Sequence, residues 1–152
     1  MSFDRFIARM NLRAANVPKE VNRVKRLAAL AVDQTVVMAT PVDTGRARSN
    51  WVVSMAEPSG QVVDPYAPLA SGKDPFKISE TANANAAISQ GQEVIAKVTP
   101  GQTICVTNNL PYIQRLNEGY SAQAPAMFVQ QAMDAGLKAV AGARIDTGKG
   151  TP

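Results

Sequence analysis

Two identical triplets, Asp43-Thr44-Gly45 and Asp146-Thr147-Gly148, come nearest to known catalytic chemistry in this chain. Asp-Thr-Gly is the signature of aspartic proteases, in which two carboxylates about 3 Å apart share a proton. Those carboxylates lie in rigid loops between hydrophobic strands. Here the first triplet follows a predicted helix and Pro41, and the second lies in a polar, glycine-rich terminus. The context of the two triplets therefore argues against a protease.

Other catalytic and metal-binding groups are scarce. The 152 residues include no histidine, the usual base at neutral pH and a common zinc ligand, and one cysteine, Cys105. Cys105 lies in the β-branched run 103–107 and is interpreted as a buried structural thiol. Residues 70–73 form no phosphate loop, because the first glycine of that motif is missing and Asp74 replaces its Ser or Thr. We expect no enzyme activity, no cofactor and no metal.

The hydrophobic pattern predicts an α+β fold: a small antiparallel sheet packed by a long N-terminal helix and a C-terminal helix, with a long interior loop. We expect an N-terminal amphipathic segment at 1–16, a single α+β domain at 17–145 and a flexible tail at 146–152. Helices are expected at 3–13, 18–39, 81–89 (with an alternative end near 96), 112–117 and 126–141, strands at 51–55 and 103–107, and the loop at 61–78.

The net charge of +4 is concentrated near the N-terminus, where residues 1–26 contain seven basic and two acidic side chains. One face of the first predicted helix is apolar, and the rest of it is basic. That helix could pack on its own domain or dock on a neighbouring molecule, and the sequence favours neither. The apolar face contains Phe3, Phe6, Ile7 and Met10, and the basic residues are Arg5, Arg9 and Arg13. No run of 18 apolar residues predicts a membrane span.

The segment from Thr40 to Trp51 is the first of two motifs. Asp43 is expected to cap the following backbone amides, and Gly45 to adopt a positive φ. Arg46 and Arg48 alternate with small residues on the way into a predicted strand, so both are expected on one face. They are either solvated or paired with a carboxylate, within the chain or across a subunit boundary, and Glu118 is the candidate partner.

The second motif runs from Tyr112 to Val129. Gly119 is expected to end a short helix and Pro125 to open the last one, so that this turn sets the angle between the last helix and the sheet. Tyr112 and Trp51 are the large aromatic residues expected to lock the junction.

Read together and in this order, the two motifs resemble the tail-completion (neck, head-to-tail joining) proteins of long-tailed bacteriophages. Those proteins show a T-P-V-D-T-G-R-x-R-x-x-W-like segment, matched here at 40–51. They also show an L-x-E-G-x-S-x-Q-A-P segment, matched here at 116–125, which includes Gln123 and Pro125. Met127 departs from the pattern, because a glycine is expected there.

The resemblance implies a virion structural protein without catalytic residues. It implies a homo-oligomeric ring, a hexamer, that completes the tail and joins it to the head connector, assembled in the host cytoplasm. Its partners would be the connector and the tail terminator or tail tube, with DNA passing through the channel without sequence recognition and no membrane contact. The loop 61–78 and residues 1–15 are expected to contact other proteins. The alternatives are a tail terminator or connector adaptor in the same neck region, and a basic nucleic-acid-binding module.

Overall fold

The computed structural model describes residues 3–41, 45–66, 75–122 and 126–146. These residues form an α+β fold with a two-stranded antiparallel sheet, a long N-terminal helix and a C-terminal helix, which confirms the predicted fold class. In chain order the elements are α1 (Phe3–Ala39), α2 (Arg46–Ser49), β1 (Val52–Met55), α3 (Pro75–Ala96), β2 (Ile104–Thr107), α4 (Ile113–Asn117) and α5 (Phe128–Gly142).

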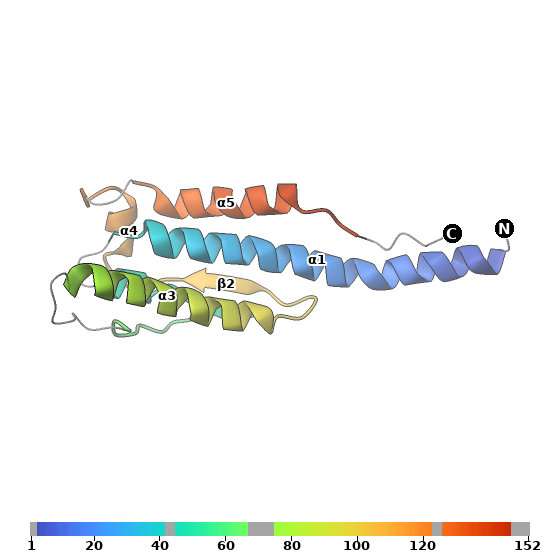
Figure 1. Ribbon diagram of the computed structural model, residues 1–152, viewed down its shortest axis with the longest axis horizontal. Helices are drawn as coiled ribbons and strands as arrows, with labels where there is room; N and C mark the ends of the chain where they lie inside the picture. The colour runs from blue at the N-terminus through green and yellow to red at the C-terminus, as the bar shows by residue number, and fades with distance from the viewer. Residues whose placement is uncertain (1–2, 42–44, 67–74, 123–125, 147–152) are drawn as a thin grey trace.

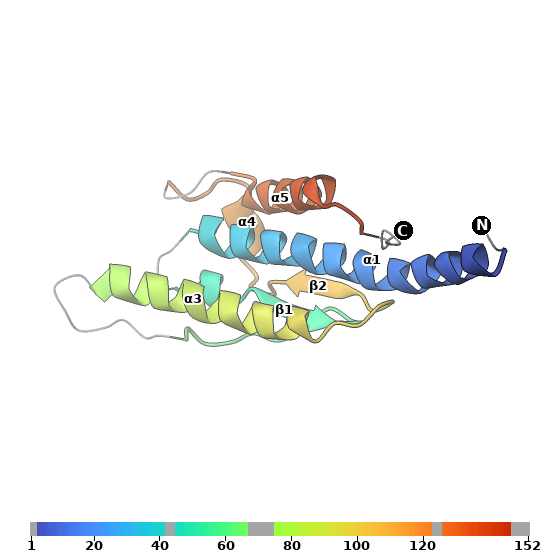
Figure 2. The same cartoon turned by 45° about the vertical axis from the view of Figure 1, so that its right-hand side comes forward.

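Helix α1 is the central element (Figure 1). In both views α5 lies along one side of α1, and α3 lies on the other side with the strands (Figures 1 and 2). The strands pair antiparallel, with Val52 opposite Thr107 and Met55 opposite Ile104. Close packing of α5 on α1 depends on Gly136, because a Cβ atom there would come within 2.6 Å of Cγ2 of Val32.

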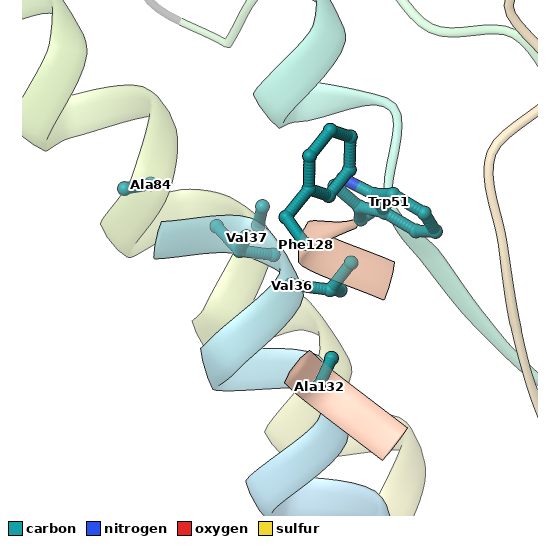
Figure 3. Close-up of a cluster of buried hydrophobic side chains, with 7 residues drawn as sticks. Val36, Val37, Trp51, Ala84, Phe128 and Ala132 are labelled. Carbon is teal, nitrogen blue, oxygen red and sulfur yellow. The ribbon is translucent and has the colours of Figure 1, made fainter. Parts of the chain in front are cut away.

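The core lies where α1, α3, α5 and the start of β1 meet, and most of its side chains are small (Figure 3). Trp51 and Phe128 are its large members, and their rings meet edge to face with centroids 6.5 Å apart. This geometry is favourable for aromatic pairs, because the positive edge of one ring faces the negative face of the other. The cluster consists of Val36, Val37, Trp51, Ala84, Ala87, Phe128 and Ala132.

The predicted break between two N-terminal helices is wrong. Helix α1 runs unbroken through Pro18 for 37 residues, or about 55 Å. A proline inside a helix removes one hydrogen bond, here the one to the carbonyl of Ala14. Ala14 is exposed, so water can hydrate that carbonyl and the helix continues.

Two other boundaries differ from those expected. Residues 46–49 form the helical turn α2 instead of leading straight into a strand, because the positive φ of Gly45 redirects the chain. Helix α3 begins at Pro75, six residues before the expected start, so the interior loop is shorter than predicted. Over the part of the chain that the structure describes, no helix combines the length and apolar composition needed to cross a membrane.

Candidate functional site

Residues 45–51, here called the hub, connect the end of α1 to the rest of the domain. Gly45 has φ = 77°, the positive value expected for it, and a Cβ atom there would come within 3.2 Å of Cγ of Asn83. Ser49 donates a hydrogen bond to Oδ1 of Asn83 at 3.0 Å. Both side chains are fully buried, so this bond ties the hub to α3 without leaving either group unsatisfied.

Arg48 caps the C-terminal end of α1. Its Nε and Nη2 atoms donate to the carbonyl of Thr40 at 3.3 and 3.1 Å, and Nη2 also donates to the carbonyl of Met38 at 3.1 Å. A cation is favourable at this end of a helix, where free carbonyls carry partial negative charge. Arg48 is buried and Arg46 is exposed, so the prediction that both arginines project from one face is wrong. The helical turn α2 separates them, since alternation applies to a strand.

Asn50 holds the chain that follows β1. Its amide donates to the carbonyls of Arg46 and Val63, both at 2.7 Å, and its Oδ1 atom accepts from the Val63 amide at 2.8 Å. From beyond β2, Asn108 donates to the carbonyl of Ala47 at 2.9 Å. Through hydrogen bonds the hub therefore contacts four separate parts of the chain: the end of α1, α3, the segment after β1 and the segment after β2.

Trp51 joins the hub to both long helices. Its Nε1 atom donates to Oγ1 of Thr40 at 2.7 Å, and the same hydroxyl donates to the carbonyl of Val36 at 2.6 Å. Its ring packs against Phe128, the first residue of α5. The two sequence motifs therefore meet at the contact of Trp51 with Phe128.

The second motif shapes the start of α5. Gly119 has φ = 92°, which confirms a glycine-dependent end of α4, and a Cβ atom there would lie 3.0 Å from Cβ of Ala126. The side chain of Asn117 accepts from the amide of Val129 at 2.9 Å, and its carbonyl accepts from the amide of Met127 at 2.7 Å. Asn117 thus caps α5 from a distance of twelve residues along the chain.

Met127 occupies the position where the resemblance leads us to expect glycine. Its φ is 65°, in the left-handed region where a glycine is free of strain and other residues are not. The backbone at this point therefore has the conformation that a glycine would favour, although the side chain is methionine.

The remaining predicted residues do not form a charged pair within the described part of the chain. Glu118 is exposed and accepts a hydrogen bond from Gln114 at 3.0 Å, and no ion pair joins it to Arg46 or Arg48. Tyr112 was predicted to pack with Trp51 at the junction, but Tyr112 is exposed. Phe128 packs against Trp51 in its place. A pair between Glu118 and an arginine of another subunit stays a prediction. Asp43, Gln123 and Pro125 lie outside the described residues.

Asp33 is a buried carboxyl group that the sequence analysis missed. It lies on α1 beside Gly91 of α3, where a Cβ atom would come within 2.9 Å of its Cγ, and neither of its oxygens has a hydrogen-bond partner among the described residues. Burial raises its pKa from 3.8 to about 7. The surrounding helices and strand enclose it completely, so it affects stability and has no access to a substrate.

The N-terminal part of α1 extends beyond the rest of the domain (Figures 1 and 2). Glu20 and Arg23, which pair with each other at 3.1 Å, hold α1 to the end of the described chain. Arg23 donates to the carbonyl of Arg144, and the amide of Asp146 donates to Glu20. We call residues 3–19, which precede these contacts, the arm. Nearly all of its side chains are exposed, including its large apolar ones.

The described residues contain no group of three His, Cys, Asp or Glu side chains that could hold a metal ion. A shallow groove between α1 and β2, about 520 Å³ in volume, is lined mainly by apolar atoms from Ala28, Val32, Ile104 and their neighbours.

No family model, curated protein or solved structure matches this chain.

Asn83 and Asn117 were also missed as site residues, although the sequence carries a signal for one of them. Asn83 shares a helical face with Ala84 and Ala87, and a polar residue on a small apolar face indicates a buried hydrogen bond. Nothing in the sequence near Asn117 indicates that it would cap α5.

We expect Arg48→Ala to lower the free energy of unfolding by about 3 kcal/mol, because it leaves two carbonyls at the end of α1 without a buried cationic donor. Arg46→Ala, the matched control two residues away, should change it by less than about 0.5 kcal/mol, because that side chain is exposed. Urea denaturation measures both. Equal effects of the two changes would show that Arg48 does not cap α1.

The buried Asp33 predicts that stability falls as pH rises. The folded state favours the protonated carboxyl, so its contribution is fully present below about pH 4, the unfolded pKa, and is lost as pH approaches 7. The predicted loss is up to about 4 kcal/mol. Asp33→Asn should flatten this part of the profile of unfolding free energy against pH, whereas the exposed Asp134→Asn should leave the profile unchanged. Urea denaturation at a series of pH values from 4 to 8 compares the two variants with the wild type. Parallel profiles for wild type and Asp33→Asn would contradict the assignment.

Proposed function

We propose that this chain is a virion structural protein of a long-tailed bacteriophage. In this role it is one subunit of a hexameric ring that completes the tail, joins it to the head connector and surrounds the DNA channel. The observation that carries the proposal is the junction of the two family-like motifs. Trp51 comes from one and Phe128 from the other, and each motif caps one of the two packed helices α1 and α5. The resemblance thus covers one connected structural unit instead of two isolated matches.

A structural role also fits the distribution of polar groups. The buried polar side chains of the hub are used in holding elements together, and the enclosed Asp33 has no opening to solvent. In the same neck region, a tail terminator or a connector adaptor would need the same features. The resemblance to the tail-completion proteins makes tail completion the first choice.

The nucleic-acid-binding alternative rests on the basic N-terminal residues, and several of these are engaged within the chain. Lys25 donates to the carbonyl of Gln102, Arg26 to the carbonyl of Val98, and Arg23 to Glu20 and Arg144. Phosphate binding by basic side chains would weaken steeply with salt. We propose that DNA passes through the channel without sequence recognition.

Deletion of the gene from the phage that encodes this chain tests the proposal. We expect filled heads and finished tails to accumulate separately in electron micrographs, and the gene supplied in trans to restore joined particles. As a control, a gene that carries the conservative change Asp134→Asn at an exposed position should restore joining as well as the wild-type gene does. Normal joined particles without the gene would contradict the proposal, as would purified protein that binds duplex DNA tightly at low salt and forms no oligomer.

A further inference from the structure

The arm exposes an apolar stripe that no described part of the domain covers. Phe3 is 74% exposed and Phe6 is 52% exposed, which leaves about 250 Å² of aromatic surface in water from these two side chains. The stripe continues at spacings of three and four through Ile7, Met10, Ala14, Val17 and Val21, all of them exposed. Monomeric soluble proteins rarely expose a contiguous apolar patch larger than a few hundred Å², so this stripe indicates a contact surface.

The arm leads away from its own domain and does not cover this stripe itself (Figures 1 and 2). It is the first part of α1, which is a single helix up to Ala39 and is fixed at that end by the hub. The stripe leads in register to Ala28, whose carbonyl lies beside Gly136 of α5. One helix therefore has a face that α5 covers in its second half and that nothing described covers in its first half.

Helix α5 carries a second uncovered apolar stripe. Its buried face contains Phe128, Ala132 and Gly136, and packs on α1 and the core. Met133, Leu137 and Val140 lie at spacings of four and three on another face, and Leu137 is 67% exposed. The stripe on α5 extends about 11 Å along the helix, so it would cover about two turns of an arm.

We propose that the arm of one copy of this chain packs its stripe against the Met133–Leu137–Val140 stripe of the next copy. The occupant is a second copy because the chain itself carries both apolar surfaces, and because the contact extends a type of packing, α1 against α5, that the chain already uses internally. This inference rests on the proposed ring and names the contact that forms it.

Because the two stripes differ, each copy would give one arm and receive one. Such a heterologous contact generates a closed ring when the rotation closes, and an open filament when it does not. The contact is apolar, so we expect it to persist at high salt, unlike a contact made by the basic residues.

Charge substitutions on the two stripes test the contact. Met10→Glu and Leu137→Glu should each raise the dissociation constant for self-association by about 100-fold or more, because each would bury a carboxylate. Leu12→Glu is the matched control: Leu12 is exposed on the opposite side of the arm from Met10, so the oligomer should survive. Light scattering at low and high salt measures mass, and circular dichroism checks that these exposed changes leave the fold intact.

Mixing the two disrupted variants distinguishes this contact from a symmetric one. The Leu137→Glu copy keeps its arm and the Met10→Glu copy keeps its α5 stripe, so a mixture should form a one-to-one dimer although neither variant assembles alone. Assembly by Leu137→Glu alone would mean that arms pair with arms, and would overturn the proposal.

Two further outcomes separate this contact from the proposed ring. An oligomer unaffected by both changes would overturn this contact but would not contradict the ring. A wild-type protein that is monomeric at all concentrations would overturn both self-assembly and this contact. The gene deletion tests the joining role independently of these outcomes.

Discussion

The hydrogen bonds that satisfy the end of α1 are the constraint on which the rest of the structure depends. The last carbonyls of a helix have no partner within it, and they are costly if they are buried without one. Thr40 and Arg48 bind the carbonyls of Val36, Met38 and Thr40, and Trp51 then binds the Thr40 hydroxyl. These bonds place the indole against Phe128, and so connect the first third of the chain to the last helix.

Fixing α1 at its C-terminal end has a consequence at the opposite end of the helix. An unbroken helix transmits its direction over its whole length, so the hub and α5 together determine where the arm projects (Figure 1). The arm therefore projects from the domain as a continuation of the same helix. In a ring, such an extension would allow an apolar contact with a neighbour at little cost in conformational entropy.

Local patterns in the sequence predicted the types of the long helices and of the two strands, and the positive φ of Gly45, because each depends on nearby residues. Sequence could not show that Arg48 is buried while Arg46 is exposed, since this follows from the helical turn and from the position of the α1 carbonyls. It also missed the enclosure of Asp33 and the cap that Asn117 provides, which depend on residues brought together from distant segments. Pro18 was expected to mark a helix boundary, yet it lies inside a solvent-exposed helix where the lost hydrogen bond is tolerated.

The most direct test of the hub as the connection between the two motifs is the coupling free energy between Trp51 and Phe128. Trp51→Leu, Phe128→Leu and the double variant form a cycle whose unfolding free energies are measured in urea. The account predicts a favourable coupling of about 1 kcal/mol, with additive effects for Trp51→Leu combined with the exposed Asp134→Asn. Additive effects in the Trp51–Phe128 cycle would contradict it, because the two motifs would then be stabilised independently.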